Sequence, residues 1–231
     1  MTNIGKLYIV STPIGNLKDI SFRSIEVLQN VDYIFAEDTR RSIKLFKTYN
    51  ISVSMISYNE YNREKRIESA IKKIIDGHDI ALITDAGTPC ISDPGYRLVR
   101  RCISIGVKII SIPGASAVLT ALVVSGLPTD RFVFEGFLPK KKGRSHKLKS
   151  LFAEERTIII FESPKRLMRT LKDLKITLGN RPVVICRELT KIHEEIWRGS
   201  LIDAEKVFSY RNIKGEITLI IGKDSKNVYF D

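Results

Sequence analysis

The sequence predicts an α/β fold with two lobes, on three observations. Short apolar runs alternate with amphipathic stretches through the first 113 residues, which is typical of a mostly parallel sheet flanked by helices. Beyond Pro113 and Gly114 the rhythm changes, and successive strands indicate a mixed sheet. The 231 residues, 43% of them apolar, suffice for two modest cores. We therefore expect an N-terminal lobe of residues 1–113 and a C-terminal lobe of residues 114–231.

In the first lobe, apolar runs predict the strands and a 3.6-residue periodicity predicts the helices. The expected strands are 7–11, 31–36, 54–57, 80–83 and 108–112, and the expected helices are 21–29, 39–49, 60–76 and 94–105. Asp93 is expected to cap the last of these helices, with Pro94 in its first position.

The second lobe opens with a short apolar helix, residues 117–125, which Gly126 and Pro128 end. Because it is apolar on every side, we expect it to be buried between the two lobes. The remaining expected elements are strands 132–136, 157–162, 183–187, 194–199 and 216–221, and helices 146–153, 163–176 and 201–210. A short polar connection between the third and fourth of these strands predicts an antiparallel pair.

Several classes of protein are disfavoured by what the sequence lacks. No apolar run reaches the roughly 18 residues of a membrane span, and the strand-like N-terminus does not resemble a signal peptide, so we expect a cytoplasmic protein without membrane contact. Three cysteines and three histidines are too scattered for a metal site, so no metal is expected. The sequence also lacks G-x-G-x-x-G, Walker A and G-x-S-x-G motifs, which disfavours dinucleotide, ATP and α/β-hydrolase sites.

Polar loops follow four of the five strands expected in the first lobe. They are residues 11–16, 37–41, 85–95 and 113–116, and they hold hydroxyls, glycines, carboxylates and arginines. The carboxyl ends of parallel strands meet at one edge of a sheet, where small molecules commonly bind. One such loop is ordinary, but four at corresponding positions predict a binding site.

A formal net charge of +12 indicates an anionic partner, and the excess is concentrated in residues 139–149, with six basic side chains and no acidic one. Such a segment is typical of nucleic-acid binding, although a solvated loop would have the same composition. A second candidate is the run from Phe161 to Arg166, where a strand end leads into a helix with Ser163 and Pro164 at its start. That helix N-terminus is suited to an anion, and plain helix capping is the alternative.

Taken in order, these loops resemble the tetrapyrrole methylases, the class III fold of S-adenosylmethionine-dependent methyltransferases, and within that family the enzymes that act on ribosomal RNA. The matching stretches are residues 11–20, 36–40, 84–95, 113–116, 134–139, 161–166, 187–191 and 214–216. They extend from near one end of the chain to near the other.

The resemblance implies a two-lobed tetrapyrrole-methylase-like fold with S-adenosylmethionine in the cleft between the lobes. The implied cofactor-binding residues are Pro13, Ile14, Asp85, Gly87, Thr88, Ile91, Ser116 and Ala117. The implied reaction is transfer of the methyl group to the ribose 2′-hydroxyl of a cytidine in the decoding region of 16S rRNA, within the 30S subunit. The family also implies a homodimer.

Catalytic and RNA-binding roles are assigned within that resemblance. Asp38 and Glu162 are candidates for the base that takes the hydroxyl proton, with bracing of loop arginines as the alternative. The candidates for contacts to RNA phosphates are Arg40, Arg41, Lys140, Lys141, Lys142, Arg144, Lys165 and Arg166. We expect the four residues of the basic segment, Arg144 included, to face solvent on a mobile turn at Gly143.

Two other functions remain open at this point. A methylase of the same fold that acts on a tetrapyrrole or another small molecule is one, and the basic segment argues against it. A non-catalytic RNA-binding module is the other, and the intact loop of residues 85–95 argues against that.

Overall fold

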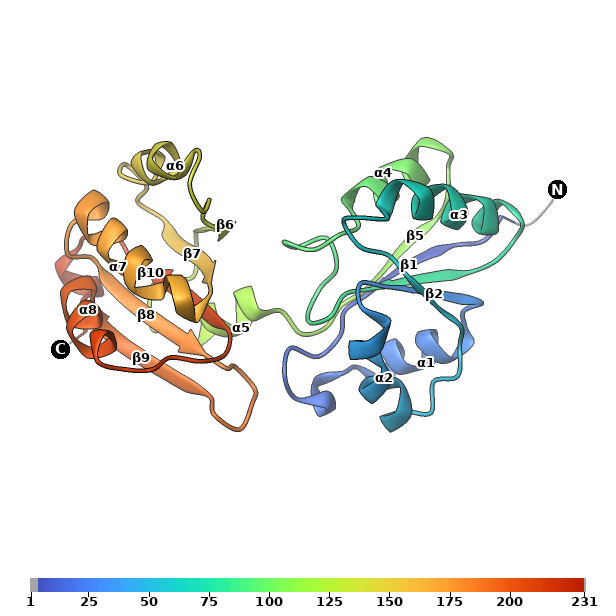
Figure 1. Ribbon diagram of the computed structural model, residues 1–231, viewed down its shortest axis with the longest axis horizontal. Coiled ribbons are helices and arrows are strands. Elements are labelled where there is room, and N and C mark those ends of the chain that lie inside the picture. Colours follow the sequence, from blue (N-terminus) through green and yellow to red (C-terminus); the bar gives the residue numbers. More distant parts are fainter. Residues whose placement is uncertain (1–3, 231) are drawn as a thin grey trace. The chain divides into compact units, whose positions relative to one another are not determined.

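The computed structural model describes residues 4–230, in two compact units (Figure 1). The first unit ends at Ser116 and the second begins at Ala117. Each unit is built around its own five-stranded sheet. Within the described residues, no helix is both long enough and apolar enough to cross a membrane.

The first unit contains a wholly parallel sheet with the strand order β3-β2-β4-β1-β5. Its strands are β1 (Leu7–Val10), β2 (Tyr33–Ala36), β3 (Met55–Ser57), β4 (Ile80–Ile83) and β5 (Ile109–Ile112). All four residues of β4, the central strand, are buried, as expected for a strand covered on both faces.

Four α-helices cover the two faces of this sheet. They are α1 (Phe22–Asn30), α2 (Thr39–Thr48), α3 (Arg63–Ile75) and α4 (Tyr96–Ser104). Figure 1 shows α3 and α4 over one face, and α1 and α2 over the other. Ile71 and Leu98 belong to the core on the first face, and Leu28 and Phe46 to the core on the second. With both faces covered, the strand ends are left as the place for a site.

The expected start of α4 is wrong. The helix begins at Tyr96, and its N-cap is Gly95 rather than Asp93. Gly95 has a φ of +146°, and a Cβ there would lie 2.5 Å from the Cys90 sulfur and 2.9 Å from a methyl group of Leu82. The chain therefore turns tightly against the core before the helix starts, and Asp93 stays in the preceding loop.

The second unit contains a mixed sheet with the order β6-β7-β10-β8-β9. Its strands are β6 (Phe132–Phe137), β7 (Thr157–Glu162), β8 (Pro182–Arg187), β9 (Glu195–Ser200) and β10 (Ile217–Ile221). Only β6 and β7 are parallel neighbours, and β8 and β9 form the expected antiparallel pair. The predicted fold class, a parallel sheet followed by a mixed sheet, is confirmed.

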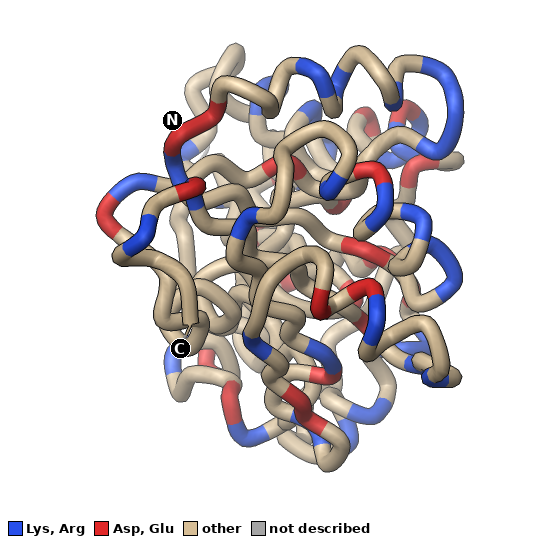
Figure 2. The backbone as a smooth tube through the Cα atoms, turned by 90° about the vertical axis from the view of Figure 1, so that its left-hand side faces the viewer, with Lys and Arg blue, Asp and Glu red and all other residues tan. Residues whose placement is uncertain are grey.

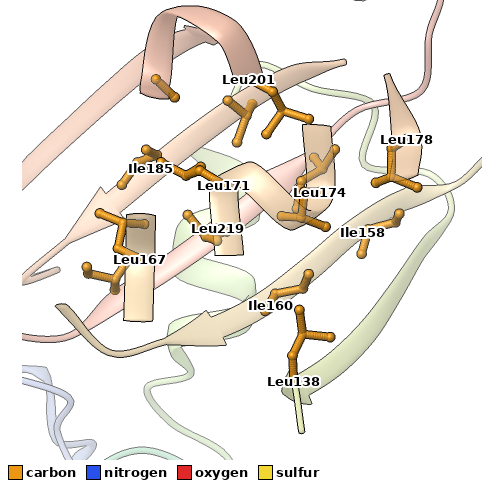
Figure 3. Close-up of a cluster of buried hydrophobic side chains, with 14 of the residues drawn as sticks. Leu138, Ile158, Ile160, Leu167, Leu171, Leu174, Leu178, Ile185, Leu201 and Leu219 are labelled. Carbon is orange, nitrogen blue, oxygen red and sulfur yellow. The ribbon is translucent and has the colours of Figure 1, made fainter. Parts of the chain in front are cut away.

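The helices of the second unit are α5 (Ala117–Val123), α6 (Arg144–Ser150), α7 (Pro164–Leu178) and α8 (Leu201–Ser209). The core lies between the sheet and α7, whose Leu167, Leu171 and Leu174 are fully buried (Figure 3). These leucines are spaced at i, i+4 and i+7, so they share one face of the helix and pack together on Ile160 and Leu219.

Within the second unit, helix α5 buries only one of its faces. Val118, Ala121 and Leu122 are buried, and the helix packs against β10. Leu119 and Val123 are 53% and 71% exposed. A helix resting on a sheet buries only the face turned toward it, so its apolar composition alone does not determine its burial.

Candidate functional site

The loops that follow β2 and β4 are hydrogen-bonded to each other at the carboxyl edge of the parallel sheet. Ala36 and Ile83 are register partners, so the residues after them are neighbours. The Thr84 hydroxyl donates to the Glu37 carboxylate at 2.6 Å, and the Asp38 backbone N–H donates to Asp85 Oδ1 at 3.0 Å. The structure thereby brings together two loops that the sequence placed at the same edge.

Asp93, which the sequence analysis expected as a helix cap, joins these carboxylates instead. Burial and then the charge of Glu37 raise the pKa of Asp93 to about 7, against the hydrogen bond of the Thr84 side chain. The pKa of Asp85 is also raised, first by burial and then by Glu37. We call Glu37, Asp38, Asp85 and Asp93 the acidic edge. Across the described residues, no cluster of three or more His, Cys, Asp or Glu is arranged to hold a metal ion.

The loops after β1 and β4 are paired through Thr12 and Gly87. Their backbones form an isolated antiparallel bridge with N···O distances of 2.9 and 3.0 Å, and the Thr12 hydroxyl donates to the Thr84 carbonyl at 3.1 Å. Gly87 has a φ of +82°, and a Cβ there would lie 3.3 Å from a methyl group of Ile14. This turn therefore favours glycine, for its backbone conformation and for its close approach to Ile14.

Thr88 connects the same region to the loop after β5. Its hydroxyl lies 3.0 Å from the Ser11 hydroxyl and donates to the Ala115 carbonyl at 3.2 Å. Of the predicted cofactor-binding residues, the first unit thus gathers Pro13, Ile14, Asp85, Gly87, Thr88 and Ser116 around one sheet edge. Ile91 lies on the loop after β4 with 44% of its surface exposed, and Ala117 is the first residue of α5.

The loop from Asp85 to Gly95 has a strained backbone. Cys90 and Ser92 have φ values of +71° and +62°, a region that L-residues seldom adopt. Such strain persists only where the surroundings enforce it, and it is common at binding sites. Burial, followed by the charge of Asp93, raises the pKa of the Cys90 thiol, which disfavours the reactive thiolate form.

Asp38, a candidate base, is occupied as a helix cap and as a partner of Arg40. Its carboxylate accepts from the Arg40 backbone N–H at 2.9 Å and from the guanidinium at 3.0 and 2.7 Å. The Arg40 side chain, and then its backbone N–H, lower the pKa of Asp38 to about 2. A carboxylate with so low a pKa is a weak proton acceptor at neutral pH. Arg41 pairs with Asp85 at 3.1 Å.

Glu162, the other candidate base, is buried and fully engaged. One oxygen accepts from the Thr170 hydroxyl at 2.6 Å, and the other accepts from the Ser163 backbone N–H at 2.8 Å and pairs with Arg166 at 3.3 Å. The chain's own carboxylate therefore lies beside the start of α7, bonded to the N-cap residue Ser163 and paired with Arg166. Lys165 is exposed there, whereas Arg166 is held by Glu162.

The expected exposure of Arg144 is wrong. Its side chain is 4% exposed, pairs with Asp173 at 2.7 Å and donates to the Thr170 hydroxyl at 2.9 Å. Gly143, with a φ of +80°, turns the chain so that α6 starts at Arg144 and the guanidinium meets α7. The lysines at 140, 141 and 142 are exposed as expected.

Two further segments, residues 187–191 and 214–216, lie against each other. Lys191 pairs with Glu188 and Glu216, each at 2.9 Å, and Glu188 accepts from the Glu216 backbone N–H at 2.9 Å. Gly215 adopts a φ of +92° with the Glu188 side chain directly against it. The sequence indicated these two segments only through the family resemblance, and not the contact between them.

The family of the chain follows from comparisons of sequence and fold. Residues 6–205 match the Tetrapyrrole (Corrin/Porphyrin) Methylases, and the chain belongs to this family of methyltransferases. Among solved structures, it is similar to the cobalamin biosynthetic enzyme cobalt precorrin-4 methyltransferase, with a TM-score of 0.71 and 20% identity over 94% of each chain. That likeness supports the fold assignment.

The chain is also similar to relatives that are named ribosomal RNA small subunit methyltransferase I. It is 47% identical to the relative from Thermotoga maritima, over 96% of this chain and 100% of that one. The relative from Synechocystis sp. is 50% identical, over 94% and 79%, and that from Escherichia coli O157:H7 is 47% identical, over 94% and 77%. The resemblance stated from the loops is confirmed.

Proposed function

We propose that this protein transfers a methyl group from S-adenosylmethionine to 16S rRNA, at the ribose 2′-hydroxyl of a cytidine in the decoding region. The observation that carries the proposal is the 47–50% identity, over nearly the whole chain, to relatives named for small-subunit rRNA methylation. The cytidine and its 2′-hydroxyl come from the resemblance of the loops.

The chemistry of the sheet edge fits this cofactor. S-adenosylmethionine carries a sulfonium and an ammonium group, and the acidic edge offers carboxylates to both. Burial and then the charge of Glu37 raise the pKa values of Asp85 and Asp93, and a nearby cation would favour the ionised form of both. Gly87 allows the backbone to come close to a ligand, and Ile14 supplies an apolar wall. The proposed cofactor-binding set is Pro13, Ile14, Asp85, Gly87, Thr88, Ile91, Ser116 and Ala117.

When bound, S-adenosylmethionine supplies a methyl group on a positively charged sulfur. The chain's own residues would hold the acceptor hydroxyl in line with that methyl group, and the hydroxyl proton would pass to a nearby base or to water as the methyl group is transferred. Alignment of this kind can lower a barrier by about 7–11 kcal/mol. The bonds of Asp38 and Glu162 favour bracing roles, and their assignment as bases stays a prediction. We therefore propose that alignment of the acceptor lowers the barrier to methyl transfer more than a general base does.

Phosphate contacts would orient the RNA rather than read its sequence. The exposed candidates are Arg40, Arg41, Lys140, Lys141, Lys142 and Lys165. Figure 2 shows basic and acidic segments interspersed along the chain, so these local groups matter more than the net charge. We further propose the 30S subunit as acceptor, action as a homodimer, and a cytoplasmic location that follows from this substrate.

The deciding experiment measures methyl transfer from labelled S-adenosylmethionine to purified 30S subunits, to naked 16S rRNA and to a porphyrinoid. Label in 16S rRNA that maps to one 2′-O-methylcytidine is the expected result. Label in the porphyrinoid alone would support the small-molecule methylase. RNA binding without cofactor binding in calorimetry would support the non-catalytic module.

A further inference from the structure

Three arginines hold three successive backbone carbonyl groups just after β6. Arg166 donates to the Leu138 carbonyl, Arg144 to the Pro139 carbonyl at 3.2 Å, and Arg169 to the Lys140 carbonyl at 3.2 Å. The arginines come from α6 and α7. The segment from Leu138 to Lys142, which we call the lysine loop, is thus fixed at consecutive peptide groups.

The arginines are themselves held by α7 and the end of β7. Asp173 pairs with Arg144 at 2.7 Å and lies 3.8 Å from Arg169. Thr170 accepts from Arg144 at 2.9 Å and donates to Glu162 at 2.6 Å. Buried polar networks in which each member is satisfied are rigid, because moving one group leaves the others unpaired. The network therefore transmits the rigidity of α7 to the lysine loop.

The lysines themselves take no part in this network. Lys140, Lys141 and Lys142 are exposed, and within residues 4–230 none of their ammonium groups has an ion-pair or hydrogen-bond partner. Three adjacent like charges repel one another, and a free loop would spread them apart. Here the three arginines hold the backbone of the loop, and the lysine ammonium groups can bind an external anion.

We propose that Arg144, Arg166 and Arg169 are positioning residues, which preorder the lysine loop as a binding site for the phosphates of RNA. The identity of the anion rests on the proposed function, whereas the ordering of the loop does not. Preordering raises affinity because less conformational entropy is lost on binding. Arg144 acts only through the loop, since its buried guanidinium has no access to a ligand.

The first test is Arg144→Gln, with binding of 30S subunits as the readout. We expect affinity to fall about three- to tenfold, and KM for 30S subunits to rise by a similar factor, with kcat and cofactor affinity unchanged. The matched control is Arg181→Gln. Arg181 is also buried and donates to two backbone carbonyls, those of Phe152 and Glu154, but its loop carries no lysine run. The control should leave 30S binding unchanged.

A double-mutant cycle separates positioning from general damage. In a background with Lys140, Lys141 and Lys142 all changed to Gln, Arg144→Gln should have no further effect on 30S binding, because the charges through which it acts are gone. An equal loss in both backgrounds, or no loss in the wild-type background, overturns the proposal.

Limited trypsin digestion tests the order of the loop without RNA. Wild-type protein should resist cleavage after Lys140, Lys141 and Lys142, and Arg144→Gln should be cut there faster than Arg181→Gln. Equal rates overturn the positioning role. Wild-type protein that resists trypsin but does not bind 30S subunits overturns the RNA part of the proposal and leaves the positioning role standing. The proposed function is tested separately, by the methyl-transfer assay.

Two milder variants keep the test valid if Arg144→Gln does not fold. Thr170→Val removes the hydroxyl between Arg144 and Glu162 at nearly constant volume. Arg169→Gln removes a side chain that is 60% exposed. Each should increase trypsin cleavage of the lysine loop and weaken 30S binding in the wild-type background only. If neither does so in folded protein, the proposal is wrong.

Discussion

Gly87 combines a left-handed backbone with a close approach to Ile14. Substitution by valine forces a β-branched residue into this conformation, at a cost of about 1–2 kcal/mol in the free energy of unfolding. The displaced turn should also weaken S-adenosylmethionine binding, measured by calorimetry.

Asp85→Ala should weaken cofactor binding as well, since it removes a carboxylate from the acidic edge.

A matched control for Gly87→Val exists elsewhere in the first unit. Gly106 has a φ of +73°, and a Cβ there would have no neighbour within 4 Å. Gly106→Val should therefore lose similar stability and keep full cofactor affinity. Equal cofactor affinity in the Gly87 and Gly106 variants would argue against placing the cofactor at this loop.

Asp93 makes stability depend on pH. Its pKa is raised from 3.8 to about 7 in the folded protein, chiefly by burial. Between about pH 4 and pH 7 the folded state keeps a proton that the unfolded state has released, so this group's contribution to stability falls as pH rises. Asp93→Asn should remove that dependence and raise the melting temperature relative to wild type more at pH 8 than at pH 5. A constant difference at both pH values would contradict it.

The same carboxyl group should couple cofactor binding to protons. A cationic ligand favours the ionised form of Asp93, so wild-type affinity for S-adenosylmethionine should increase as pH rises through about 7. Calorimetry in buffers of different ionisation enthalpy should detect release of a proton near that pH. The Asp93→Asn variant serves as the control and should release fewer protons.

At the scale of elements, the exposed lysines of the lysine loop can be replaced without changing the arginines that hold its backbone. Replacing Lys140, Lys141 and Lys142 with Gln, with Arg144 left in place, should weaken 30S binding. The slope of log affinity against log salt should become shallower by roughly two to three, about 0.7–0.9 for each RNA phosphate that a lysine no longer neutralises. Cofactor affinity and melting temperature should be almost unchanged.

A second set of exposed lysines in the same unit, Lys206, Lys223 and Lys226, provides the comparison at equal charge. Their replacement with Gln should reduce binding less and leave the salt slope nearly intact. If both triple variants lose affinity equally, only the total charge matters and the lysine loop has no special role.

Elements that depend on local pattern were predictable, and contacts between elements were not. Strand β4 and strand β7 have the expected bounds, because a short apolar run with polar ends specifies a buried strand. The start of α4 was missed because Gly95 packs closely on Leu82 of β4 as well as on Cys90, and the periodicity of the helix does not encode that contact. Arg144 was misplaced for a similar reason, since its partner Asp173 is far away in the sequence.

The candidate site shows the same division. The edge of the sheet and the loops that meet there followed from the order of strands and polar segments. The role of Asp93 depended on its burial beside Glu37, and that of Glu162 on the bonds from Ser163 and Thr170 that occupy its oxygens. Electrostatic neighbours of this kind become visible only in three dimensions.

At the scale of the whole molecule, the family leads us to expect a homodimer. Two-fold dimers are the commonest soluble assemblies. Light scattering at micromolar concentration should give twice the chain mass of 26.2 kDa. A mass of one chain across the concentrations at which methyl transfer is observed would contradict this expectation.

The network beneath the lysine loop also restricts which substitutions this sequence can accept. Loss of Asp173 alone leaves the buried Arg144 guanidinium without its carboxylate, at a cost of roughly 3 kcal/mol, which is a large share of a typical domain's stability. Loss of Arg144 costs less, because Asp173 is partly exposed and keeps Arg169 as a partner at 3.8 Å. An exchange of Asp173 therefore requires a compensating exchange at Arg144. The exposed lysines have no such partner. Substitutions at these positions can therefore change the charge of the loop, while the residues that hold its backbone stay the same.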